Sequence, residues 1–164
     1  MFRVVNLRTA TLSDAAAVAW VHHTTWIATY GAILPPEFWV TATLERRTST
    51  WKRWLSNGAA PVVAEVEGQV VGISMSGDAV EQDDVLPVRD RQLYLLYVLG
   101  AYHGTGIGQA LLDAAVPPGT GAQLWVAEDN PRARRFYERN GFVLEGARIV
   151  EASTADLAEV RMVR

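Results

Sequence analysis

The sequence predicts a single mixed α/β domain over residues 1–164, and three observations point to it. Segments with the alternation of strands and segments with helical spacing follow one another along the whole chain. Hydrophobic residues make up 49% of the 164 residues and charged residues 20%, an ordinary balance for a globular domain. Linkers, repeats and low-complexity stretches are absent from the sequence, so nothing in it suggests a second domain.

In the first half of the chain, a strand and two helices precede a hairpin. Ser13 is of the type that caps a helix N-terminus, whereas Pro35 and Pro36 cannot continue a helix. Glu67 and Gly68 suit a tight turn between two strands. The predicted order is a strand at 2–10, a helix from 11–26 that fades near Gly31, a loop at 33–39, a helix at 43–58 with Leu44, Trp51, Trp54 and Leu55 facing inward, and two strands within 60–79.

In the second half, strands and helices alternate until a closing pair of strands. The nearly continuous apolar run at 92–100 is typical of a strand that is buried on both faces. Pro131 suits the first turn of a helix, and Gly141 suits the position just past its end. The predicted order is a polar loop at 80–91, the strand at 92–100, a glycine-rich stretch that opens a helix, a strand at 122–130, a helix at 131–142, and strands at 142–150 and 157–164.

Composition and charge exclude several classes of function. The chain has no cysteine, so it has no disulfide, thiol nucleophile or cysteine-based metal site. Its formal net charge of −3 argues against a general nucleic-acid binder. No apolar run is long enough to span a membrane, and the first residues lack the apolar core of a signal peptide. We therefore expect a cytoplasmic protein without a metal, a nucleic-acid partner or a membrane partner.

The stretch YHGTGIGQALLDAA places three glycines directly before residues with helical spacing. Glycines allow the backbone to curl around a phosphate, and a helix N-terminus attracts anions. Gly104, Gly106 and Gly108 fit that use. Gln109 and Ala110 stand where a Walker loop needs Lys and Ser or Thr, and Gln109 also breaks the dinucleotide fingerprint. The alternative is that these glycines only form a tight turn between a strand and a helix.

A second motif follows in the stretch WVAEDNPRARRFYERNGF. Ala133, Phe136 and Tyr137 share one face of its predicted helix, so Tyr137 should face the sheet and a cleft beside it. The alternative for Tyr137 is a core aromatic residue whose hydroxyl reaches the edge of the core. Asn130 before Pro131 suits a helix cap, a role that is compatible with ligand binding through a different group.

Together the two stretches resemble the GCN5-related N-acetyltransferases, the GNAT superfamily, over residues 93–142. The family's acetyl-coenzyme A loop has the pattern Arg/Gln-x-x-Gly-x-Gly/Ala, which His103, Gly106 and Gly108 match with His103 as a departure. The second family pattern is Asn-x-x-Ala-x-x-Phe/Leu-Tyr followed by Gly-Phe. Its matching residues are Asn130, Ala133, Phe136, Tyr137, Gly141 and Phe142.

The resemblance implies a GNAT fold, with a mixed, mostly antiparallel sheet of about six to seven strands flanked by about four helices. It implies acetyl transfer from acetyl-CoA to a primary amine of a small molecule or peptide, by direct attack in a ternary complex and without a metal. Tyr137 is then the proton donor to the departing thiolate. The implied cofactor-binding residues are Tyr97, Val98, Leu99, His103, Gly104, Thr105, Gly106, Ile107, Gly108, Asn130, Ala133 and Tyr137.

The general base is not identified by the resemblance. Gln92 stands where many relatives have a glutamate, and an amide cannot usefully take a proton. Asp90, Glu65 and Glu81 are possible substitutes through water, although each is more typical of a solvated carboxylate. His22 is interpreted with its neighbour His23 as a surface or packing residue, although His22 alone could face the acceptor.

The acceptor is expected to bind among the N-terminal helices, which lie outside the cofactor motifs. Trp26, Tyr30 and Phe38 are the predicted acceptor-binding residues, with a small hydrophobic core between the helices as the alternative. A homodimer is one expected state, because dimers are common among similar proteins. The competing function is a non-catalytic GNAT-fold module that binds an acyl-CoA, which the missing carboxylate at Gln92 keeps open.

Overall fold

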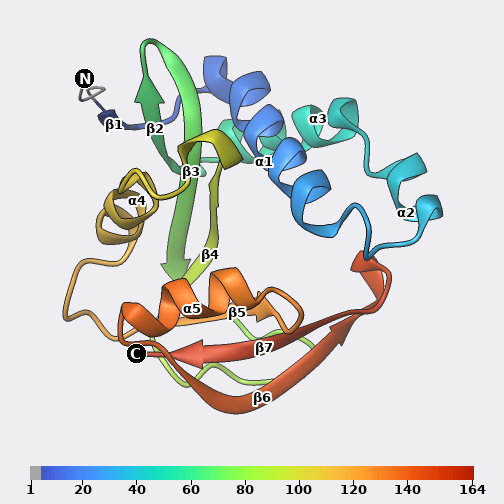
Figure 1. The fold of residues 1–164 in the computed structure, drawn as a ribbon, viewed down its shortest axis with the longest axis vertical. Coiled ribbons are helices and arrows are strands. Elements are labelled where there is room, and N and C mark those ends of the chain that lie inside the picture. The colour runs from blue at the N-terminus through green and yellow to red at the C-terminus, as the bar shows by residue number, and fades with distance from the viewer. Residues whose placement is uncertain (1–4) are drawn as a thin grey trace. The chain divides into compact units, whose positions relative to one another are not determined.

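The computed structural model describes residues 5–164, so the part of the first predicted strand at residues 2–4 lies outside the described residues. The described strands form one seven-stranded sheet in the order β1-β2-β3-β4-β5-β7-β6 (Figure 1). Four of its strand pairs are antiparallel, and β4 with β5 is parallel, which confirms the predicted mixed and mostly antiparallel sheet. The strands are β1 Val5–Thr9, β2 Val62–Val66, β3 Gln69–Asp78, β4 Arg91–Val98, β5 Gln123–Ala127, β6 Val143–Glu151 and β7 Leu157–Val163.

Four longer helices and one short helix accompany this sheet. The prediction of a loop at 33–39 is wrong in part, because Pro36 begins a helix, where its missing N–H leaves no hydrogen bond unmade. The prediction of Ser13 as an N-cap is also wrong, because a 3₁₀ turn at Leu12–Asp14 precedes the first helix. The helices are α1 Ala15–Tyr30, α2 Pro36–Thr41, α3 Leu44–Ser56, α4 Ile107–Ala115 and α5 Pro131–Arg139.

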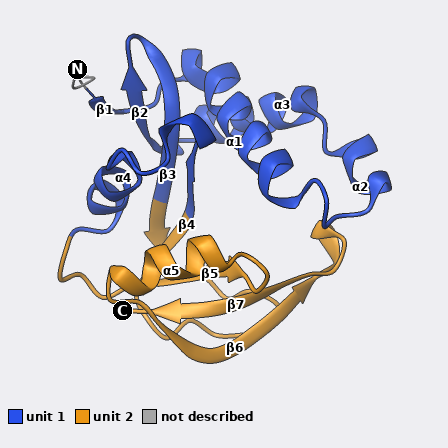
Figure 2. Ribbon diagram, in the orientation of Figure 1, with its two compact units in different colours: residues 1–75, 95–117 blue, residues 76–94, 118–164 orange. Residues whose placement is uncertain are grey.

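The chain divides into two compact units, each described here by itself (Figure 2). The first unit contains residues up to 75 together with 95–117, and the second contains 76–94 together with 118–164. The chain therefore passes between the two units three times: within β3, within β4 and in the segment after α4. The prediction of one domain over residues 1–164 stays a prediction.

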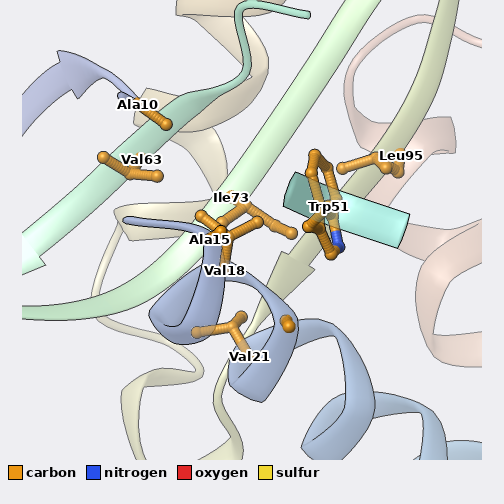
Figure 3. Close-up of a cluster of buried hydrophobic side chains, with 9 residues drawn as sticks. Ala10, Ala15, Val18, Val21, Trp51, Val63, Ile73 and Leu95 are labelled. Carbon is orange, nitrogen blue, oxygen red and sulfur yellow. The ribbon is translucent and has the colours of Figure 1, made fainter. Parts of the chain in front are cut away.

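The core of the first unit lies between α1, α3 and one face of the strands. Trp51 of α3 is 0% exposed and packs with Ile73 of β3 and Leu95 of β4 (Figure 3). Leu44 and Trp54 of α3 are each 37% exposed, so the expectation that these two side chains face inward is wrong. Trp20 of α1 is 51% exposed. The buried stripe of α1 instead follows the spacing i, i+3, i+4, i+7 at Ala15, Val18, Ala19 and His22.

The other face of the first unit's strands packs against α4. Gly72 of β3 allows this packing, because an added Cβ would lie 2.8 Å from Leu111 Cδ1 and 3.2 Å from the carbonyl oxygen of Tyr97. The β2–β3 register skips Val71, as in a β-bulge, and the Val71 carbonyl accepts a hydrogen bond from Leu99 N–H at 2.9 Å. Gly72 and the bulge therefore set where α4 begins relative to the end of β4.

The second unit contains α5 and the strands β5, β7 and β6. Arg161 of β7 is buried and forms an ion pair with Glu145 of β6 at 2.9 Å. Arg164 donates to the carbonyl oxygen of Asn140, which ties the end of β7 to the end of α5. Gln92 of β4 and Gln123 of β5 face each other in the parallel ladder and share a buried hydrogen bond of 2.9 Å.

Substituting Trp51 by alanine should lower the free energy of unfolding by about 3–5 kcal/mol, because it removes a fully buried indole from the core. Trp20→Ala is the matched control, and it should lower that free energy by less than about 2 kcal/mol, since half of this residue is already exposed. Urea unfolding followed by circular dichroism measures both variants. Equal losses would show that the core is not centred on Trp51.

Candidate functional site

The glycine-rich stretch leaves β4 through a 3₁₀ turn at Gly100–Tyr102 and then opens α4. Gly104 and Gly106 have φ values of +76° and +88°, in the left-handed region that favours glycine. An added Cβ at either position would meet no atom within 4 Å. The backbone conformation, and not crowding, therefore requires these glycines. The space around the loop is open, so a ligand could approach the first N–H groups of α4.

Two side chains hold this loop against β4. Because a carbonyl only accepts, His103 Nε2 carries a proton and donates it to the Val98 carbonyl oxygen at 2.8 Å. Thr105 Oγ1 donates to the Tyr102 carbonyl oxygen at 2.6 Å. His103, which stands in the Arg/Gln position of the family pattern, therefore fastens the loop to the end of the strand.

The end of β4 is surrounded by aromatic side chains of the first unit. The Tyr97 hydroxyl accepts a hydrogen bond from Trp26 Nε1 at 3.0 Å. The Tyr97 ring also stacks on His22, with ring centroids 4.7 Å apart and an interplanar angle of 19°. Tyr97 therefore connects the predicted cofactor segment, Tyr97 to Leu99, directly to α1.

The three predicted acceptor-binding residues lie together. The Trp26 and Tyr30 ring centroids are 4.8 Å apart, and those of Trp26 and Phe38 are 6.1 Å apart. Tyr30 is buried. These contacts agree with the alternative of a small hydrophobic core between α1 and α2, and acceptor binding by this cluster stays a prediction.

His22 is a buried hub of polar contacts, in agreement with its interpretation as a packing residue. Trp51 Nε1 donates to His22 Nδ1 at 3.1 Å, and Arg47 Nη1 lies 2.5 Å from His22 Nε2. Burial lowers the pKa of His22 to about 2, with further contributions from the charges of Arg47 and His23. His22 is therefore neutral at any ordinary pH.

A pocket of about 190 Å³ lies beside His22 at the N-terminal half of α3. Arg47 is half-buried, its guanidinium carbon lies 5.4 Å from the centre of the Trp26 ring, and burial lowers the pKa of its guanidinium. This pocket was not predicted from the sequence. The usable signal was the row of polar residues at the spacing i, i+3, i+4 and i+7, which are Thr43, Arg46, Arg47 and Thr50. The lining residues are His22, Ala42, Thr43, Arg46, Arg47, Thr50, Trp51 and Trp54.

In the second unit, the predicted residues surround the N-terminus and the buried face of α5. Asn130 Oδ1 accepts a hydrogen bond from Ala133 N–H at 3.1 Å, which confirms the predicted helix cap. Tyr137 is 8% exposed, and its ring makes edge contacts with Phe136 and Phe142 at centroid distances of 5.3 and 5.8 Å. Tyr137 is thus on the packed side of α5, as its spacing predicts.

The carboxylates named as possible bases have ordinary surroundings. Glu65 forms an ion pair with Arg8 at 2.9 Å, while Asp90 and Glu81 are exposed. Gln92 is buried, and its amide oxygen accepts the hydrogen bond from Gln123. The site of the missing glutamate is therefore part of the packing of the second unit.

Glu159 of β7 is a titratable group that the sequence analysis missed. Burial raises the pKa of its carboxyl to about 7, and the nearby charges of Glu151 and Asp83 act in the same direction. Gln82 Nε2 lies 3.5 Å from Glu159 Oε2. No local sequence signal could have revealed it, because the residues around Glu159 come from three separate segments.

Within residues 5–164, no group of three or more His, Asp or Glu side chains is placed to hold a metal ion. None of the helices in the same range has the length and apolar character needed to cross a membrane.

The sequence matches the family model described as an acetyltransferase (GNAT) domain over residues 57–144, more than half of the chain. A protein of Mycobacterium tuberculosis, described as a probable N-acetyltransferase, is 29% identical over 155 residues, which cover 87% of this chain and 82% of that protein. A protein of Bacillus subtilis, described as an uncharacterized N-acetyltransferase, is 27% identical over 161 residues, covering 90% of each chain.

Solved structures share the fold over almost the whole chain. The PaiA N-acetyltransferase of Thermoplasma acidophilum, in complex with coenzyme A, has a TM-score of 0.69 and 20% identity over 98% of both chains. A histone acetyltransferase HPA2 and related acetyltransferase of Corynebacterium glutamicum has a TM-score of 0.70 and 20% identity over 97% of this chain and 94% of that chain. These likenesses confirm the predicted fold.

The burial of neutral His22 should make stability depend on pH. An unfolded histidine takes up a proton below a pH of about 6.5, whereas folded His22 stays neutral down to a pH of about 2, so stability is full above pH 6.5 and falls as the pH decreases. Between about pH 7.5 and pH 5, the wild-type protein should lose about 2 kcal/mol more than His22→Gln. Urea unfolding at the two pH values measures this difference, and equal losses would contradict the burial of a neutral imidazole.

Proposed function

We propose that this chain, which belongs to the GNAT acetyltransferase family, moves an acetyl group from acetyl-CoA to the primary amine of a small molecule or peptide. The observation that carries the proposal is the glycine loop at the N-terminus of α4, with its two left-handed glycines. The coenzyme A complex of the Thermoplasma acidophilum protein with the same fold supports the choice of donor.

The residues of the loop fit a pyrophosphate group. The N-terminus of α4 offers unpaired N–H groups and the positive end of a helix dipole. Gly104 and Gly106 keep side chains away from that end, and an added Cβ at either would point into open space. His103 and Thr105 bond to backbone carbonyls, so the loop is held in place before a ligand arrives. Backbone N–H groups would therefore bind the phosphates without a metal-binding carboxylate.

Acetyl-CoA supplies an activated thioester. The chain's own groups would position its acyl group and protonate the departing sulfur. Backbone groups at Tyr97 to Leu99 would orient the acyl group, since this segment lies directly before the loop. The Tyr137 hydroxyl would donate a proton to the departing sulfur, as the resemblance implies. The amine must be neutral to attack, and direct attack requires no nucleophilic side chain, which agrees with a sequence without cysteine.

Acetyl-CoA should raise the melting temperature of the protein by about 5 °C or more at about a hundredfold excess over its Kd, because a ligand that binds only the folded state stabilises it. ATP and NAD should leave the melting temperature unchanged. Gly106→Ala should lose most of the shift and about 1–2 kcal/mol of stability, because a Cβ is strained at a φ of +88°. Gly100→Ala is the control, since its φ is not positive and it has room for a Cβ.

Differential scanning fluorimetry measures these shifts, and an equal shift with ATP would overturn the assignment of the donor. Release of free coenzyme A over a panel of amines then tests the transfer itself. A protein that binds acetyl-CoA but acetylates no amine would favour the non-catalytic module.

Tyr137→Phe should lower kcat at least tenfold and change the Kd of acetyl-CoA by less than about threefold, because it removes a proton donor but keeps the buried ring. Tyr94→Phe is the matched control in the same unit, since the Tyr94 hydroxyl bonds to the Asp78 carbonyl oxygen. Steady-state kinetics and thermal shift measure the two quantities. An unchanged kcat with a good acceptor would exclude Tyr137 as the acid.

A further inference from the structure

The pocket beside α3 contains a half-buried cation, Arg47, for which the described part of the chain provides no counterion. No carboxylate of residues 5–164 forms an ion pair with Arg47, and none of the residues that line the pocket is acidic. The Arg47 Nε atom is buried and makes no hydrogen bond. A buried charge without a partner is costly in a folded protein. An anionic ligand would supply the counterion and the hydrogen-bond acceptor that Arg47 lacks.

The contact between Arg47 and His22 is also incomplete. An indole N–H can only donate, so His22 Nδ1 must accept from Trp51 Nε1, and the single proton of the neutral ring then lies on Nε2. A guanidinium can only donate as well, so Arg47 Nη1 and His22 Nε2–H face each other as two donors. These two atoms are only 2.5 Å apart, so an oxygen that accepts from both must bind beside the pair, on the pocket side.

The shape and charge of the pocket favour a carboxylate as that acceptor. Its planar pair of oxygens matches the planar fork of the half-buried Arg47 guanidinium, and the exposed Arg46 adds a second positive charge to the lining. Thr43 caps α3, so the positive end of this helix also faces the pocket's residues. The volume of about 190 Å³ admits a carboxylate with a short carbon chain.

The same pocket adjoins the segment proposed to orient the acyl group. His22 forms its wall and stacks on Tyr97, with ring centroids 4.7 Å apart. A small molecule whose carboxylate binds beside Arg47 and His22, on the pocket side, would therefore be close to the end of β4. Resting on the proposed acetyl transfer, we propose that the acceptor is a small amino-carboxylate, whose carboxylate binds Arg47 and His22 Nε2–H and whose primary amine receives the acetyl group.

Matched ligand pairs test the binding site in the wild-type protein without acetyl-CoA. Glycine, β-alanine and 4-aminobutyrate are compared with their amides, with acetate and inorganic phosphate as probes of the anion alone. Titrations follow the intrinsic tryptophan fluorescence, to which the pocket residues Trp51 and Trp54 contribute two of the chain's six tryptophans. We expect at least one amino-carboxylate to bind at least tenfold tighter than its amide. Equal binding of all acids and amides, or binding of phosphate alone, would overturn the proposal.

The variant Arg47→Gln should abolish the preference for the acid over its amide. Arg53→Gln is the matched control, because Arg53 lies exposed on the same helix and outside the pocket. In turnover assays, Arg47→Gln should raise the KM of the amino-carboxylate at least tenfold while the KM of acetyl-CoA stays within about threefold. If Arg47→Gln fails to fold, the acid and amide pairs in the wild-type protein still decide the question.

The outcomes also separate this inference from the proposed function. Carboxylate binding is measured without acetyl-CoA, so an absent acetyl-CoA shift would overturn the donor and leave the anion site intact. Acetylation of amines without a carboxylate, equally fast in the wild-type protein and Arg47→Gln, would keep the transferase and overturn the acceptor class.

Discussion

The hydrogen bond from Trp51 to His22 is the interaction on which the arrangement of the first unit depends. A fully buried indole must find an acceptor for its N–H, and His22 Nδ1 supplies it across the interface of α1 and α3. The bond fixes the tautomer of His22 and the plane of its ring. That plane stacks on Tyr97, so the core contact also orients the residues at the end of β4. The core packing and the polar pocket thus share Trp51, which belongs to the hydrophobic core and also lines the pocket.

Local motifs were predictable because their physics is local. Gly104 and Gly106 have the positive φ values that a glycine-rich turn before a helix requires, and Asn130 caps α5 as its place before Pro131 predicts. Two sequence motifs in the right order were enough to identify the fold. Pro36 shows the limit of such rules, since the residue that cannot continue a helix can begin one.

The pocket could not be predicted from spacing along the chain. His22 and Arg47 lie 25 residues apart in the sequence and meet only because α1 and α3 turn these side chains toward each other. The packing of Trp51 against His22 sets the orientation of the two helices. Helical periodicity suggested Trp54 as an inward residue, although it is partly exposed at the rim of the pocket. Likewise, the pKa of Glu159 is raised by burial and then by the charges of Glu151 and Asp83, and only the folded second unit creates these surroundings.

The first unit contains two positively polarised features that differ in their physics. The N-terminus of α4 has backbone dipoles and open glycines, so it can hold an anion without any buried charge. The Arg47 pocket instead keeps a full charge half-buried, whereas Arg8, Arg148 and Arg161 each have a carboxylate partner. A backbone cradle tolerates an absent ligand, because water can replace it at an exposed loop. A half-buried guanidinium that faces another donor is stabilised far less by the folded chain alone. The two features therefore suit different ligands: under the proposed function, the loop would hold the phosphates of coenzyme A and the pocket would select among acceptors.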